Sequence, residues 1–132
     1  MRIVAMLLVA LASFASNATQ FTLPFELCKD RNAMLVAIEV NGKPAHLLLD
    51  TGSEFTILST ASAGITDVEL KKTSFGNGPG MSGDAIWGIA DIRLPGLMLD
   101  QQRVVVMNLE QVRRIYGKNV DGLLGQDILG QF

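Results

Sequence analysis

The side chains that could do chemistry are few, and the most suggestive is the carboxylate of Asp50. The chain has one cysteine, Cys28, and one histidine, His46. One cysteine excludes an internal disulfide framework and any multi-cysteine zinc site. One histidine leaves few parts for Ser-His-Asp, Cys-His or histidine–metal chemistry. If the chain is an enzyme, carboxylates are its expected reagents. Asp50 opens an Asp-Thr-Gly-Ser sequence directly after the apolar run Leu47-Leu48-Leu49.

Two short motifs together resemble the signatures of the retropepsin-like aspartic proteases, the small relatives of retroviral protease and of each pepsin lobe. The first is the segment around Asp50, which continues into Thr56-Ile57-Leu58-Ser59. The second is Leu123-Leu124-Gly125 near the C-terminus, where that family carries an apolar pair before glycine. The resemblance extends from about residue 34 to the end. It implies a mostly β fold, a small closed barrel-like half of an acid protease with one or two short helices.

The resemblance also implies a role for each residue of the first motif. Asp50 is the catalytic aspartate, and the Thr51 hydroxyl is expected to bond to the opposing loop of a second copy. Gly52 lacks a side chain, which lets two such loops approach each other closely. Ser53 is expected to donate a hydrogen bond to the Asp50 carboxylate and to orient it. The alternative is a plain turn between two strands, where these four residue types are common.

Peptide hydrolysis by carboxylates requires two of them around one water molecule. One must be ionised to take a proton from the water, and the other protonated to polarise the substrate carbonyl. Two carboxyl groups about 3 Å apart cannot both ionise, so the pair creates this asymmetry itself. Because the chain contains one Asp-Thr-Gly, the second aspartate is expected from a second copy. The expected enzyme is a two-fold homodimer that cuts polypeptides without a metal or an organic cofactor.

A glycine-rich segment at residues 76–83 is predicted to be a flap that closes over the substrate. It contains Gly78 and Gly80, and its backbone is freer than any other part of the chain. Closing loops of this kind exclude water and hold a peptide extended. Trp87 is a candidate for the wall of the pocket. The alternatives are an ordinary hairpin loop for the segment and a core position for the tryptophan.

Apolar patterning predicts the strands that must position these residues. Residues 34–40 and 43–49 predict two strands joined by Asn41-Gly42, the strongest short-range hairpin signal. Alternation over residues 86–94 and the valine run within residues 102–107 predict two more strands.

Two helices are expected in the C-terminal third. Asn108 is expected to cap the first helix and Gly117 to end it. A second helix is expected over residues 126–129. Asp121 and Asp127 are assigned to a turn and a helix start rather than to catalysis. The inner face of the first helix is predicted to carry Leu109, Val112, Ile115 and Tyr116.

The first residues predict a secretory leader rather than a part of the fold. A basic start at Arg2 precedes an apolar run over residues 3–12, which is too short to span a bilayer. Small residues at Ser16 and Ala18 then fit signal-peptidase cleavage after Ala18, which leaves one domain at residues 19–132. We therefore expect an exported, periplasmic or secreted protein that contacts a membrane only through an uncleaved leader. A buried N-terminal helix is the alternative.

Charge and the C-terminus bear on the remaining function classes. The net charge of −2 lacks the clustered basic excess of a nucleic-acid-binding protein. Family domains usually continue into further strands that build the dimer interface, whereas this chain ends at Phe132. It is therefore expected either to be a fragment or to dimerise through other edges. The alternative function is a non-catalytic, exported interaction or ligand-binding module of the same fold. A small β-barrel for an apolar ligand would leave both motifs unexplained.

Overall fold

The computed structural model describes residues 21–28, 32–61, 69–72 and 85–132. Two sequence predictions lie outside these ranges. They are the leader at residues 1–18 and the glycine-rich segment at residues 76–83, with Gly78 and Gly80. Within the described ranges, none of the helices has the length and apolarity that crossing a membrane requires.

The predicted hairpin forms as expected. Its strands, β2 (Met34–Val40) and β3 (Lys43–Leu49), pair antiparallel. Asn41 and Gly42 both adopt positive φ, 50° and 77°, as a two-residue hairpin turn of this type requires. Pro44 lies at the start of β3, where a residue without an N–H is tolerated.

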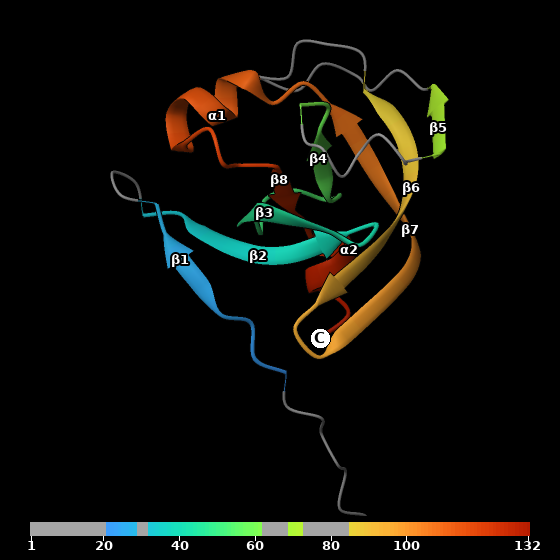
Figure 1. Cartoon of the computed structure of the whole chain (residues 1–132), viewed down its shortest axis with the longest axis horizontal. Coiled ribbons are helices and arrows are strands. Elements are labelled where there is room, and N and C mark those ends of the chain that lie inside the picture. Colours follow the sequence, from blue (N-terminus) through green and yellow to red (C-terminus); the bar gives the residue numbers. More distant parts are fainter. Residues whose placement is uncertain (1–20, 29–31, 62–68, 73–84) are drawn as a thin grey trace, which may run out of the picture.

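The remaining strands complete one sheet that closes on itself. They are β1 (Phe25–Leu27), β4 (Ile57–Ser59), β5 (Glu69–Lys72), β6 (Ile86–Leu94), β7 (Leu97–Met107) and β8 (Gly122–Leu124). The strand order is β1-β2-β3-β8-β4-β7-β6-β5, and an additional pairing joins β2 to β6. The strands from β2 round to β6 therefore form a closed barrel, with β1 and β5 at its margins (Figure 1). The predicted mostly β, barrel-like fold is confirmed.

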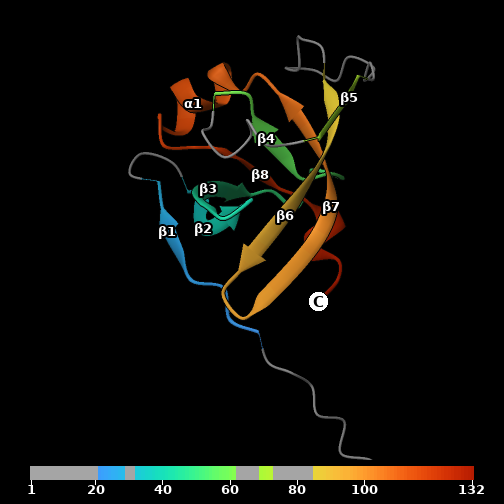
Figure 2. The same cartoon turned by 45° about the vertical axis from the view of Figure 1, so that its right-hand side comes forward.

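A second hairpin joins β6 and β7, which the sequence pattern predicted only as two separate strands. β6 has the predicted bounds, but β7 begins at Leu97, five residues before the expected start. Gly96 makes this possible because its φ of 81° closes a tight turn directly after β6. The two long strands cross one side of the barrel together (Figure 2).

The core consists of two clusters on opposite faces of the strands. The inner cluster receives side chains from all the barrel strands and from Ile128. The second cluster contains the residues that alternate with them. Leu47 belongs to the inner cluster and Leu48 to the second, so the apolar run of β3 is covered on both faces, as predicted. Members of the second cluster are Leu35, Leu48, Ile57, Ala85, Val105, Met107, Leu109, Val120 and Leu123.

The two helices are short, and two details of the first were predicted wrongly. In α1 (Glu110–Tyr116), Val112 and Tyr116 pack against the second cluster, whereas Ile115 is 52% exposed. At about 100° per residue, Val112 and Tyr116 share a narrow stripe and Ile115 falls to one side of it. Asn108 does not occupy the N-cap position, which belongs to Leu109. The Asn108 Oδ1 instead accepts the N–H of Glu110, the first residue of the helix, at 2.8 Å. The second helix, α2 (Gln126–Leu129), has the predicted bounds.

Candidate active site

Asp50 lies at the point where β3 leaves the sheet. β3 runs parallel to β8, with Leu49 beside Leu124, and the N–H of Asp50 donates to the Leu124 carbonyl at 3.0 Å. The aspartate is half-buried. The two sequence motifs, more than seventy positions apart, are thus joined by parallel strand pairing, which places the second motif directly beside the catalytic candidate.

The loop after Asp50 turns tightly around its carboxylate. The Gly52 N–H donates to Asp50 Oδ1 at 3.0 Å, and the Ser53 N–H donates to the Asp50 carbonyl at 3.3 Å. The first bond limits the directions in which the carboxylate can point. Gly52 is exposed, and a Cβ there would lie 3.3 Å from Asp50 Oδ1. Glycine therefore keeps the approach to the carboxylate open.

The Ser53 side chain makes a different contact from the one that the resemblance implied. Its Oγ donates to the carbonyl of Phe55 at 2.7 Å. A hydroxyl has one proton to donate, so this bond replaces the expected donation to Asp50. The chain turns back into β4 directly after Ser53 and brings the Phe55 carbonyl within reach. Ser53 therefore supports the loop, and the orienting donor to Asp50 is the Gly52 N–H.

Glycines in the C-terminal motif allow close contact with the strand that follows the loop. A Cβ at Gly125 would lie 2.5 Å from the Phe55 carbonyl carbon and oxygen. A Cβ at Gly122 would lie 2.2 Å from the Ile57 carbonyl oxygen. Neither distance occurs between real atoms of these kinds, so both positions need glycine. Leu123 and Leu124 lie between them and are buried, as expected of an apolar pair in the motif.

A buried hydrogen-bond network, which the sequence did not reveal, ties the loop to α2. Thr56 is fully buried. Its Oγ1 donates to Asp127 Oδ1 at 2.8 Å and accepts the Gly125 N–H at 3.1 Å. Asp127 does lie at a helix start, as predicted, and its Oδ1 also accepts the Ile128 N–H at 2.9 Å. The sequence signals that could have predicted this network are Thr56, six residues after Asp50, and Asp127, two residues after Gly125.

Gln126 is a second residue that sequence reasoning missed. Its Nε2 donates to the Thr51 carbonyl at 3.0 Å, and its own N–H donates to the Ser53 carbonyl at 2.8 Å. The loop is therefore held by the C-terminal segment on two sides. Thr51 itself is exposed, and its hydroxyl contact with a second copy stays a prediction. A glutamine in a polar turn gave no signal, because only the fold shows what it faces.

Trp87 lies near this loop rather than deep in the core. It is half-buried, and its ring meets Phe55 edge to face at a centroid distance of 5.0 Å and an angle of 85°. The Arg103 guanidinium lies 4.3 Å from the Trp87 ring centroid. Gly78 and Gly80, the other candidates for substrate contact, belong to the segment outside the described residues.

His46 and Asp121 meet beside the middle of β3 and take no part in this site. The His46 N–H donates to Asp121 Oδ2 at 2.8 Å, and its ring Nδ1 lies 3.9 Å from the same oxygen. This agrees with the interpretation of both as structural residues. Among the described residues, no group of three or more His, Cys, Asp or Glu side chains could hold a metal ion.

Comparison with known proteins agrees with this geometry. The sequence model of a family described as aspartyl protease matches residues 36–128. The chain is similar to EIAV protease complexed with the inhibitor HBY-793, with a TM-score of 0.56, 21% identity, and coverage of 78% of this chain and 90% of that one. It is also similar to a retropepsin-like aspartic protease from Rickettsia conorii, with a TM-score of 0.53, 17% identity, and coverage of 86% and 85%.

The predicted resemblance and fold are thereby confirmed. Both structural matches place the chain in the retropepsin-like fold. No curated protein matches the chain.

Proposed function

Because the chain belongs to the aspartyl protease family, we propose that it is a homodimeric, aspartic-type endopeptidase in which Asp50 of each copy activates one water molecule. The observation that carries the proposal is the setting of Asp50. Asp50 directly follows β3, the strand that pairs with the second motif. Its carboxylate accepts the Gly52 N–H in a loop that Gln126 also contacts. A carboxylate oriented in this way is ready to share a water with its symmetry mate.

The proposed reaction uses one proton of the carboxyl pair and one of the water. The ionised Asp50 takes a proton from the water, whose oxygen attacks the carbonyl carbon of the scissile bond. The protonated Asp50 of the other copy donates its proton to the carbonyl oxygen. The bond between carbon and nitrogen then breaks as the first Asp50 gives the proton from the water to the amide nitrogen. One hydroxyl of the tetrahedral intermediate at the same time returns a proton to the second Asp50, which restores the singly protonated pair. The substrate is an extended polypeptide.

The first test is cleavage of an unstructured peptide mixture by the purified protein, followed by mass spectrometry from about pH 3 to 7, where such carboxyl pairs titrate. We expect a bell-shaped pH profile that Asp50→Asn abolishes. Asp100→Asn is the matched control, because it makes the same chemical change at an exposed position on β7. Equal activity of the wild type and Asp50→Asn would refute the proposal.

A mixing experiment tests the homodimer. If two Asp50 side chains form one site, an equal mixture of wild type and Asp50→Asn retains about a quarter of the activity of wild type at the same total concentration. A site contained in one chain would retain about half. A protein that binds the same peptides without cutting them would instead be the non-catalytic module of this fold.

A further inference from the structure

A row of side chains crosses the sheet from β3, which ends at Asp50, to Trp87 on β6. Strand register places Leu48 beside Leu123, Leu123 beside Ile57, Ile57 beside Val105, and Val105 beside Trp87. All five pack in or against the second cluster. One face of the sheet is therefore continuous from the catalytic strand to the tryptophan.

A second row lies two residues away and contains Asp50 itself. Residues two apart along an extended chain share a face. β3 and β8 run in one direction, and β4 and β7 run in the other. Moving two residues forward along β3 and β8, or two residues back along β4 and β7, therefore leads to the same side of the first row. From the residues of the first row on these strands, this shift reaches Asp50, Gly125, Phe55 and Arg103.

Two further observations support this alignment. A Cβ at Gly125 would touch the Phe55 backbone at 2.5 Å, so these neighbours in the row adjoin. Arg103 also pairs with Ile89 on β6. From Asp50 to Arg103 the row crosses three strand spacings, which is about 14 Å along the sheet. An extended peptide covers that distance in about four residues.

Arg103 is exposed and lies over one aromatic ring at the end of this row. Its guanidinium covers the Trp87 ring, which in turn packs at nearly a right angle to Phe55. The ion pairs within the described part of the chain join His46 to Asp121, Arg93 to Glu39 and Arg114 to Glu110. Arg103 takes part in none of them, so its donors remain available to a carboxylate from outside.

We propose, on the basis of the protease function proposed above, that Arg103 and Trp87 form a subsite for an acidic side chain of the substrate, about four residues from the scissile bond. The planar guanidinium can donate two parallel hydrogen bonds to a carboxylate. Stacking on Trp87 fixes that plane and excludes water from one of its faces. The preferred substrates are then polypeptides with Glu or Asp at this distance from the cut.

The chain offers a direct probe of binding at this subsite, because Trp87 is its sole tryptophan. Tryptophan fluorescence therefore reports on the proposed subsite alone. We would titrate Asp50→Asn, which cannot cut, with two peptides that differ by Glu or Gln at one position. The expected result is a change in Trp87 emission and an affinity about three- to tenfold higher for the Glu peptide. Raising the salt concentration should reduce the difference.

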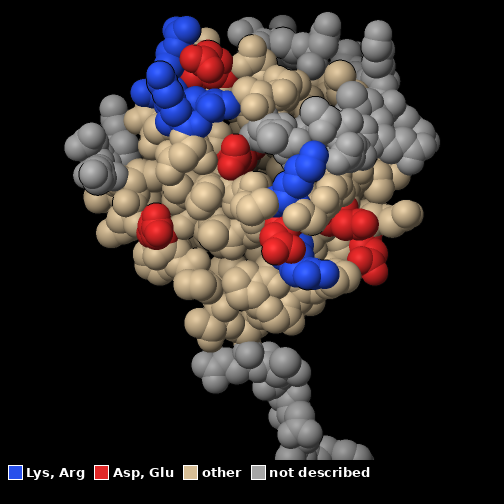
Figure 3. Space-filling view, in the orientation of Figure 1, with Lys and Arg blue, Asp and Glu red and all other residues tan. Residues whose placement is uncertain are grey.

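Matched arginine variants separate the subsite from general charge attraction. Arg103→Gln should remove the preference for Glu over Gln. Arg114→Gln makes the same charge change on α1, the helix over which Lys and Arg side chains gather in Figure 3, and should keep the preference. Equal affinities of Asp50→Asn with Arg103 intact for the two peptides, the absence of binding, or a preference that survives the addition of Arg103→Gln would each overturn the subsite.

The two proposals fail in distinguishable ways. Cleavage that depends on Asp50 but shows no preference for acidic side chains leaves the protease and refutes the subsite. Selective binding of the Glu peptide through Arg103, without any cleavage by the wild type, refutes the protease and leaves an acidic-peptide-binding site on the same face of the sheet.

Discussion

The Asp50 loop and the two hairpin turns of the barrel are held in different ways. The Asp50 loop is fixed by residues far away in the sequence. Thr56 bonds to Asp127, Gly125 to Thr56, and Gln126 to Thr51, across separations of 71, 69 and 75 residues. Glycine at position 125 is required there by the space that the Phe55 backbone occupies. The conformation of this loop therefore exists only once the barrel has assembled.

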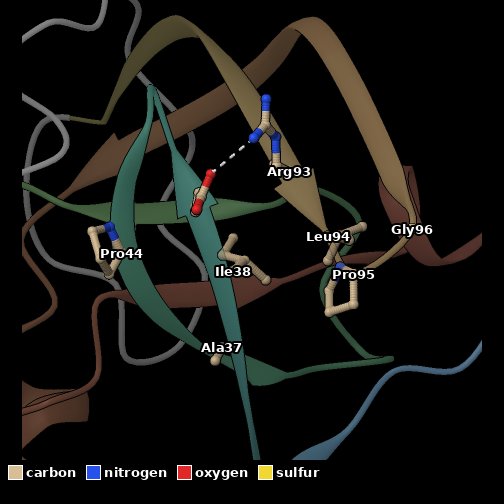
Figure 4. Close-up of a pocket in the computed structure, with 8 residues that line it drawn as sticks. Ala37, Ile38, Pro44, Arg93, Leu94, Pro95 and Gly96 are labelled. Carbon is tan, nitrogen blue, oxygen red and sulfur yellow. Dashed lines mark ion pairs between the residues drawn. The ribbon is translucent and has the colours of Figure 1, made fainter.

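In the turns of the two hairpins, glycine is required by the backbone conformation itself. Gly42 and Gly96 have φ of 77° and 81°, and a Cβ at Gly42 would meet nothing within 4 Å. The hairpins leave a shallow cleft of about 410 Å³ between them, crossed by the exposed ion pair of Glu39 and Arg93 at 3.7 Å (Figure 4). Such a pair contributes about 0 to 1 kcal/mol. Glycine is thus required by close backbone contact beside the Asp50 loop and by positive φ in the hairpin turns.

The largest expected effect is that of Gly125→Ala. The added Cβ would lie 2.5 Å from the Phe55 carbonyl and 2.9 Å from the Thr56 nitrogen. These are backbone atoms, so β4 or α2 must move, and we expect a loss of about 3 kcal/mol or more in the free energy of unfolding. Urea denaturation followed by circular dichroism measures it.

Gly42→Ala, in the turn between β2 and β3, is the matched control for Gly125→Ala. It meets open space and suffers only the strain of positive φ, about 1 kcal/mol. If it destabilised the protein as much as Gly125→Ala, the contrast between a spatial and a conformational need for glycine would be wrong.

A smaller loss of stability is expected for Thr56→Val. Valine has nearly the same shape but can neither donate to Asp127 nor accept from Gly125, and both partners then lose a buried bond. We expect a loss of about 2 to 4 kcal/mol in the free energy of unfolding, measured in urea. Asp127→Asn keeps an acceptor oxygen for Thr56 and should cost less. A near-neutral Thr56→Val would show that the network does not hold the loop.

Local patterns predicted β2, β3, β6, both helices and part of β7, because the apolar periodicity of each is a property of its own residues. The short strands β1, β4, β5 and β8 gave no such pattern and were not predicted. Asn41-Gly42 has the chemistry of its turn, and the alternation in residues 86–94 matches the buried face of β6. Where the burial of a side chain depends on how its element packs, the local pattern was insufficient. Ile115 fits a helical apolar face, but the packing of α1 against the second cluster leaves its side chain exposed to solvent.

The sequence predicted where the candidate site lies but not the hydrogen bonds that hold it. The Asp-Thr-Gly-Ser sequence and Leu123-Leu124-Gly125 located Asp50 and its neighbouring strand. They did not predict that Ser53 donates to Phe55 or that Gln126 reaches Thr51. These bonds depend on which loop lies opposite a given side chain, and that is set by the pairing of β3 and β8 across more than seventy residues.

The smallest change in stability, with a selective effect on activity, is expected for Gln126→Ala. The side chain is exposed, so losing its bond to the Thr51 carbonyl costs about 1 kcal/mol at most. The loop that carries Asp50 would nevertheless gain freedom, and small misplacements of a catalytic group are costly. We expect kcat to fall by about tenfold with little change in KM, in a peptide cleavage assay.

Gln131→Ala separates this effect from a general loosening of α2. Gln131 Nε2 also donates to a carbonyl, that of Asp127 at 2.8 Å, but it does not touch the Asp50 loop. Its removal should change stability by a similar amount and leave kcat unaltered. If both variants lowered kcat equally, α2 would act only as a structural support. If only Gln126→Ala did so, Gln126 would be a positioning residue for Asp50. The conformation of the Asp50 loop would then depend on a side-chain contact of a kind that the hairpin turns do not need.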